Sequence, residues 1–147
     1  MSDDVSARVL TEALRDSRQS IREIARRIGV SSGTVASRLK DMEESGIIRR
    51  YSAVLDYEKL GYELTAITEI TISEGKMLDV GVEIAKLNQA TAVYNVTGDA
   101  DIMVVGKFRT RKELSDFTKG VLTIPHVVRT KTHLVLNTMK EDFSIIP

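Results

Sequence analysis

The residues between Ser31 and Lys40 combine hydroxyl, glycine and basic side chains in a pattern that fits a helix lying against DNA. Hydroxyls and unpaired backbone N–H groups at a helix N-terminus favour phosphate. An exposed arginine can donate paired hydrogen bonds to guanine or bind a phosphate. The candidate DNA contacts, which include basic residues on either side, are Arg22, Ser31, Ser32, Gly33, Thr34, Ser37, Arg38, Lys40, Arg49 and Arg50.

Each of these residues also has an interpretation that needs no DNA. Arg38 could pair with Asp41 or Glu44 inside the protein. The hydroxyl groups at the start of the helix could serve only as caps. The whole stretch could be a small helical hairpin used for packing. What favours DNA contact is that all the features occur together at the offsets of a helix-turn-helix.

Two short helices joined by a tight corner must position these side chains. Gly29 lies where a left-handed residue would end the first helix, and Val30 would fill the angle between the two. The second helix, expected over about 32–45 and ended by Gly46, would present its polar residues to a major groove. The inward apolar positions at helical spacing are Ile21, Ile24, Ala25 and Ile28, then Val35, Leu39 and Met42.

Further elements are expected around this pair. A preceding helix is predicted from Val5 to Arg15, and Ser20 with Glu23 forms a capping box before the next one. Ile47–Leu55 alternates loosely and predicts a strand, a wing with Arg49 and Arg50 at its start to meet phosphates.

The rest of the chain predicts a β-α-β-β-α-β order, the ferredoxin-like arrangement. With the helices on one face of the sheet, apolar Val93, Val104 and Val135 would remain on the other and need a partner sheet, which predicts a dimer. The predicted class is α+β, with a winged helix-turn-helix in residues 1–55, a linker at 56–61 and a ferredoxin-like domain in 62–147. The expected elements are strands at Tyr62–Ser73, Ala92–Val96, Asp101–Phe108 and Val127–Leu136, and helices at Lys76–Leu87 and after Thr110, which forms a second capping box with Glu113.

Composition excludes several classes of protein. The 147 residues carry no net charge, but residues 1–55 hold 10 Lys and Arg against 8 Asp and Glu, and a dimer would double this excess. The chain has no Cys, so it has no disulfide and no thiolate metal site. The acidic N-terminus is not a signal peptide, and no apolar run could span a membrane. We expect a soluble cytoplasmic protein.

Catalysis and metal binding find no support in the sequence. There is no Gly-x-Ser-x-Gly elbow, no Gly-rich phosphate loop and no carboxylate pair in a motif. His126 and His133 are seven residues apart, which puts them on opposite faces of a strand. We therefore expect no enzyme, no metal and no cofactor other than an effector.

From about Ser20 to Lys140 the chain closely resembles the Lrp/AsnC family of archaeal and bacterial transcription regulators. The motifs that carry the resemblance are Glu23-Ile24-Ala25, Gly29-Val30-Ser31, Val35-x-x-Arg38, Glu44-Ser45-Gly46-Ile47-Ile48, Tyr51-Ser52-Ala53-Val54-Leu55-Asp56, Leu60-Gly61, Val96-Thr97-Gly98-Asp99-x-Asp101 and Ile124-Pro125. The first helix lacks the family's Leu-Asp-x-x-Asp opening, and Ala100 stands where a bulky side chain is common.

The resemblance implies a DNA-binding domain, a domain that binds small effectors, usually amino acids, and assembly as dimers, tetramers or octamers. It places the effector at Thr97, Gly98, Asp99, Ala100 and Asp101, where backbone N–H groups would hold a carboxylate and an aspartate an ammonium group. Without the resemblance, Gly98 and its neighbours would be an ordinary tight turn. The predicted function is sequence-specific regulation of transcription. The alternative is a metabolite-sensing oligomer that binds DNA weakly or without specificity.

Overall fold

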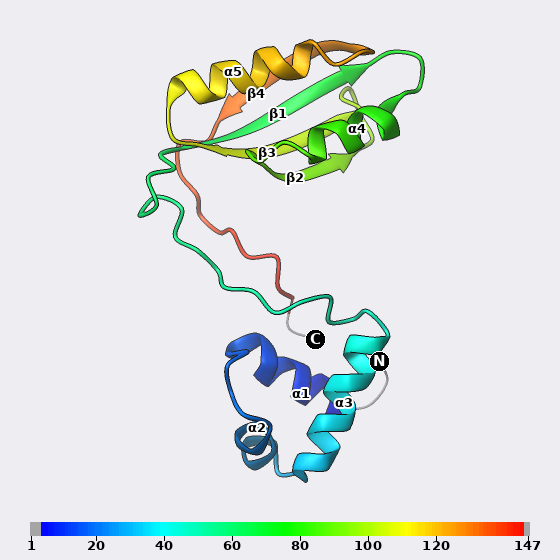
Figure 1. The fold of residues 1–147 in the computed structure, drawn as a ribbon, viewed down its shortest axis with the longest axis vertical. Coiled ribbons are helices and arrows are strands. Elements are labelled where there is room, and N and C mark those ends of the chain that lie inside the picture. The colour runs from blue at the N-terminus through cyan, green and yellow to red at the C-terminus, as the bar shows by residue number, and fades with distance from the viewer. Residues whose placement is uncertain (1–3, 146–147) are drawn as a thin grey trace. The chain divides into compact units, whose positions relative to one another are not determined.

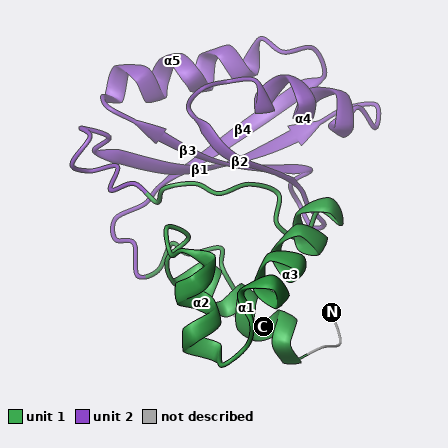
Figure 2. Ribbon diagram, turned by 60° about the horizontal axis from the view of Figure 1, so that its bottom comes forward, with its two compact units in different colours: residues 1–54, 140–147 green, residues 55–139 purple. Residues whose placement is uncertain are grey.

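The computed structural model describes residues 4–145, which form two compact units (Figure 2). One unit comprises the described residues up to Val54 together with those from Lys140 onward, and the other comprises Leu55–Met139. No helix in the described part of the chain is long and apolar enough to cross a membrane.

Three helices build the first unit: α1 (Asp4–Arg15), α2 (Ile21–Ile28) and α3 (Ser32–Glu44) (Figure 1). Their shared core is apolar, as the helical spacing predicts. Ile21 is a correction, because it is 41% exposed: as the first residue of α2 it lies beyond the packed stripe. The buried core residues are Val9, Ile24, Ala25, Ile28, Val35 and Met42, with Val30 and Leu39 packed against them.

The second unit is an antiparallel sheet in the strand order β2-β3-β1-β4, with both of its helices on one face (Figure 1). This confirms the predicted βαββαβ fold. Its elements are β1 (Leu64–Ile72), α4 (Met77–Ala85), β2 (Ala90–Asn95), β3 (Ile102–Phe108), α5 (Arg111–Leu122) and β4 (Val127–Leu134).

The register of the sheet corrects the predicted open face. Val104 pairs with Thr68 of β1 and with Val93 of β2, so all three share the helix-covered face, where Val104 is fully buried. The apolar side chains on the open face include Ile67, Met103, Val105 and Tyr94 by the alternation of the same register, and Val135, which lies opposite Thr65, is on this face as predicted. The sequence alternation was correct for β1, but within β2 and β3 it carried no information on which face meets the helices.

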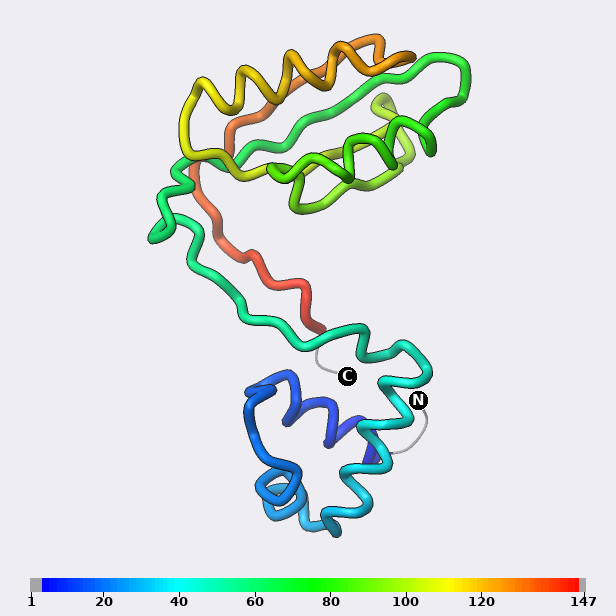
Figure 3. The backbone as a smooth tube through the Cα atoms, viewed as in Figure 1, coloured from blue at the N-terminus to red at the C-terminus, as the bar shows by residue number. Residues whose placement is uncertain are grey.

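The wing strand predicted at Ile47–Leu55 is wrong for this structure. After α3 the chain makes a turn at Gly46 (φ 74°) and then runs without regular secondary structure as far as β1 (Figure 3). A strand requires a hydrogen-bonded neighbour, and within the described residues this segment pairs with none. Most of its apolar side chains are consequently exposed, with Val54 at 96%, whereas Ile48 packs against the core of the helices.

Candidate nucleic-acid interface and effector loop

The corner between α2 and α3 is set by local hydrogen bonds. The Ser20 hydroxyl accepts a hydrogen bond from the Glu23 backbone N–H (3.2 Å), which caps α2 at its start. Gly29 takes the left-handed conformation (φ 73°), and its N–H donates to the Ala25 carbonyl (2.9 Å). Gly29 is thus at its predicted place, because a residue with a Cβ is strained at this φ.

Ser31, rather than Ser32, caps α3. Its hydroxyl oxygen accepts a hydrogen bond from the Thr34 N–H (3.0 Å) and lies 2.8 Å from the Thr34 hydroxyl. The capping interpretation is therefore correct for Ser31. This cap does not use the other backbone N–H groups of the first turn, and such groups stabilise an anion at a helix N-terminus. Phosphate binding at this end of α3 therefore stays a prediction.

The outer surface of α3 carries the predicted polar and basic side chains. Its inner surface is fixed by buried Val35 and Met42. Lys40 lies 3.6 Å from Glu44 on the same helix, an exposed pair that holds the lysine only weakly. Of the predicted DNA contacts, Arg22, Ser31, Ser32, Gly33, Ser37, Lys40, Arg49 and Arg50 are exposed, whereas Thr34 and Arg38 are half-buried. Eight of the ten candidate residues are thus open to a partner.

The chain beyond α3 is tied back to that helix. The Ile48 N–H donates to the Met42 carbonyl (2.9 Å), and the Tyr51 hydroxyl donates to Glu43 Oε1 (2.7 Å). Partial burial and the adjacent Glu43 carboxylate raise the pKa of Tyr51 to about 12. These two contacts place Arg49 and Arg50 beside the end of α3 although no strand is formed.

The predicted effector loop connects β2 to β3. Thr97, Gly98 and Asp99 are exposed, and Ala100 is buried. Gly98 has φ 114°, and a Cβ added there would meet no atom within 4 Å. The conformation alone thus accounts for glycine at this position, so a close approach of ligand to its backbone stays a prediction.

Asp101 has a structural role that sequence reasoning missed. Its Oδ2 accepts a hydrogen bond from the Ile72 N–H (2.7 Å), at the irregularity where β1 shifts register against β4. Its own N–H donates to the Ile70 carbonyl (3.0 Å). One carboxylate oxygen of Asp101 is therefore used by the fold, and the exposed carboxylate of the loop is that of Asp99.

Each histidine is associated with its own carboxylate. His133 Nε2 lies 2.7 Å from Glu69 Oε1, and this contact holds the pKa of the Glu69 carboxyl below its ordinary value. His126 Nδ1 lies 3.5 Å from Glu74 Oε2. Within residues 4–145 no three His, Asp or Glu side chains are grouped so that they could hold a metal ion.

Comparison with known proteins settles the family. A winged helix-turn-helix DNA-binding model matches residues 2–49, and the Lrp/AsnC ligand-binding domain model matches residues 65–145, more than half of the chain. This chain belongs to the Lrp/AsnC family of transcriptional regulators. It is therefore a DNA-binding helix-turn-helix protein with a ligand-binding domain, and this family of regulators is not enzymatic.

Individual known proteins match this chain over nearly their whole length. An uncharacterised HTH-type transcriptional regulator of Pyrococcus horikoshii is 44% identical over 145 residues, 99% of this chain and 98% of the relative. The structure of Escherichia coli AsnC superposes with a TM-score of 0.92 at 23% identity, covering 100% of this chain and 99% of that one. A Neisseria meningitidis transcriptional regulator solved with L-Met superposes with a TM-score of 0.89 at 23% identity, covering 99% of this chain and 96% of that one.

Proposed function

We propose that this Lrp/AsnC protein binds specific DNA sequences, and that a small effector, an amino acid, changes its assembly or its DNA affinity. The observation that carries the proposal is the surface of α3, where exposed hydroxyl, glycine and basic residues lie on a helix whose opposite side is fixed in a core. In this proposal residues 1–55 form the DNA-binding domain and residues 56–61 form the linker. Residues 62–147 form the domain that binds the effector and joins the copies of the chain into an oligomer.

The proposed DNA-binding form is a homodimer. The open face of the sheet carries the apolar side chains of Ile67, Met103, Val105 and Tyr94, and a second copy of the sheet would remove them from water. Two copies of α3 about 34–36 Å apart would then enter successive major-groove faces, and the site would be a degenerate palindrome.

The proposed effector site is the loop from Thr97 to Asp101. Backbone N–H groups near Gly98 would hold the α-carboxylate, and the exposed Asp99 would hold the α-ammonium group. The N. meningitidis complex with L-Met supports an amino acid as the class of effector. A coupling of about 1–3 kcal/mol between the two sites would be typical, and DNA would change effector affinity by the same factor.

One observation favours a second function, a metabolite sensor that binds DNA only weakly. The chain has no net charge, and several helical cations have carboxylate partners nearby, among them Lys40 with Glu44 and Arg27 with Glu23. Tight amino-acid binding with no salt-dependent DNA binding would support this alternative.

Selection of bound fragments from random DNA, with and without a pool of amino acids, tests the proposal. A recurrent palindromic sequence is expected, together with a change in yield when the effector is present. Arg38→Ala should then weaken binding to the selected sequence by about 1–3 kcal/mol if the side chain contacts a base, and should weaken binding to all DNA alike if it contacts a phosphate. Unchanged affinity in Arg38→Ala would contradict the assignment of α3.

A further inference from the structure

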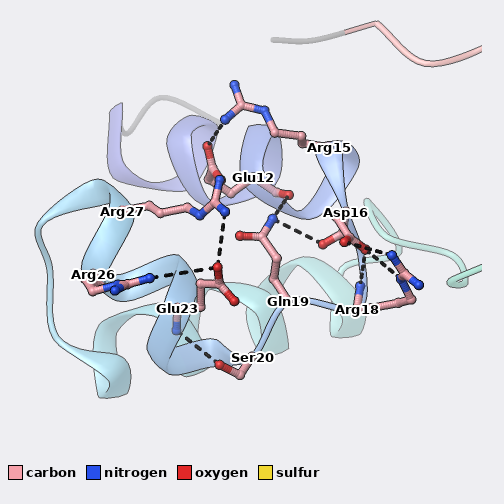
Figure 4. Close-up of polar contacts among 9 residues, drawn as sticks. All are labelled: Glu12, Arg15, Asp16, Arg18, Gln19, Ser20, Glu23, Arg26 and Arg27. Carbon is pink, nitrogen blue, oxygen red and sulfur yellow. Dashed lines mark hydrogen bonds and ion pairs between the residues drawn. The ribbon is translucent and has the colours of Figure 1, made fainter.

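A charged network joins α1 to α2 through residues that are not among the predicted DNA contacts (Figure 4). Its centre is Glu12. This carboxylate is only 8% exposed, because it lies on the same side of α1 as the core residues Val9 and Ala13. A buried carboxylate is costly unless cations or hydrogen-bond donors compensate it. Glu12 therefore needs its partners, and they come from two helices.

The partners of Glu12 are two arginines. Arg15 Nη1, one turn further along α1, donates to Glu12 Oε1 at 2.9 Å. Arg27 Nη1, on α2, lies 3.6 Å from Glu12 Oε2, a buried oxygen that has no closer hydrogen-bond donor. Arg27 is therefore the cation that compensates the second carboxylate oxygen, and it does so from the neighbouring helix.

Arg27 is itself held at a defined place. Its Nη2 donates to Glu23 Oε1 at 3.1 Å, so that one guanidinium lies between a carboxylate of α1 and a carboxylate of α2. Figure 4 shows the Arg27 side chain extending from α2 between these two groups. A planar guanidinium with several fixed donors suits such a position, which a flexible lysine would fill less well.

Two further contacts join α1 to the helix-turn-helix. Gln19 Nε2 donates to the Glu12 carbonyl at 3.0 Å, which fixes the connection between α1 and α2. Arg8 donates to the carbonyl of Ile28, the last residue of α2 and the one before the Gly29 corner. Arg8 and Glu12 of α1 thus both contact the last turn of α2, and α2 leads through a tight corner into α3.

We infer that Glu12 and Arg27 are positioning residues for DNA recognition. They hold α2 at a fixed angle to α1 and, through the Gly29 corner, fix the direction in which α3 meets DNA. The inference rests on the proposed sequence-specific binding. Base contacts depend on hydrogen-bond distance and angle, so a tilted α3 loses them. Long basic side chains still reach phosphates, so binding to unrelated DNA remains.

The chain offers a matched pair of variants to test this role. Arg26, next to Arg27 on α2, has a side chain that is 80% exposed and lies no closer than 4.0 Å to Glu23. Arg27→Gln and Arg26→Gln remove the same charge, so their general electrostatic effects on DNA binding are alike. We expect Arg27→Gln to weaken binding of the full-length protein to its selected sequence about tenfold, the scale of one lost base contact, and Arg26→Gln to change it much less.

Glu12→Gln separates geometry from charge. It keeps the shape of the side chain and raises the net charge by one, so electrostatics alone would tighten binding to all DNA. The positioning role predicts the opposite for the selected sequence, with binding to unrelated DNA unchanged or tighter. Circular dichroism at the assay temperature checks that each variant is folded, so that a loss of affinity reports geometry rather than unfolding.

Three results would overturn the inference. Equal affinities of Arg27→Gln and Arg26→Gln would show that the link to Glu12 does not matter. A uniform loss in Arg27→Gln on all DNA, with the salt slope reduced by about one, would make Arg27 a phosphate contact. Tighter specific binding in Glu12→Gln would exclude a positioning role. A wild-type protein without sequence preference in the same titrations would contradict the proposed function itself, which is a distinct outcome.

Discussion

Replacing Gly33 by alanine should make the protein more stable and its DNA binding weaker. Gly33 lies in the first turn of α3, and an added Cβ would have only the Ser31 hydroxyl oxygen nearby, at 3.7 Å, an ordinary contact. Alanine in a helix is favoured over glycine by roughly 0.5–1 kcal/mol. For a unit of this size that gain corresponds to a rise of about 2–8 °C in the melting temperature.

The effect on DNA should have the opposite sign. Gly33 is exposed at the end of α3 that we propose enters the major groove, where the backbone would lie close to the DNA. A methyl group there would displace the helix by a few tenths of an ångström or more and strain its hydrogen bonds. We expect specific affinity to fall at least about fivefold, equivalent to roughly 1 kcal/mol.

Gly120→Ala is the matched control, because Gly120 is also helical and exposed, on α5, with nothing within 4 Å of its added Cβ. Gly120→Ala should stabilise the unit that contains α5 without changing the affinity for DNA. Calorimetric melting and fluorescence anisotropy with the selected fragment measure both quantities. A Gly33→Ala protein that is more stable and binds DNA as the wild type does would refute the assignment of this end of α3.

Three other predictions concern the loop, the segment after α3 and the sheet. Gly98→Val should cost about 1–3 kcal/mol, because φ is 114° there, and should also abolish amino-acid binding measured by calorimetry; retained affinity would make the loop an ordinary turn. Tyr51 has a raised pKa, so its contribution to stability is complete below its ordinary pKa of 10 and is lost as the pH approaches 12. The difference in melting temperature between wild type and Tyr51→Phe should therefore shrink over that range, and a constant difference would contradict the contact with Glu43. A fragment from Leu60 to Pro147, which contains the whole core of the sheet unit, should sediment as a dimer at micromolar concentration, and a stable monomer would refute the proposed pairing of sheets.

The parts of the fold that depend on local chemistry were predictable from the sequence. Gly29 ends α2 because its φ is positive, and Ser20 and Thr110 cap the helices that follow them. The alternation in β1 was also correct, since Ala66, Thr68 and Ile70 are buried beneath the helices. Each of these features is decided by a few neighbouring residues, so the order of elements follows from them.

The errors lie where the answer depends on distant residues. Whether Val104 faces the helices is decided by the register against β1, which alternation within one strand does not reveal. The segment 47–55 alternates like a strand, but no strand among residues 4–145 pairs with it. The structural role of Asp101 was missed for the same reason, because its bond to the Ile72 N–H spans 29 residues. Glu12 did leave a signal, a carboxylate within the apolar stripe of α1, but its partner Arg27 could be found only in the structure.

Chemical protection of guanine N7 on the selected DNA fragment tests the central claim most directly, because this atom is reached only through the major groove. The account predicts two protected half-sites whose centres are about one helical turn apart, and the loss of that protection in Arg38→Ala. A bound fragment with no protected guanine N7, or a pattern of protection that does not depend on DNA sequence, would contradict it.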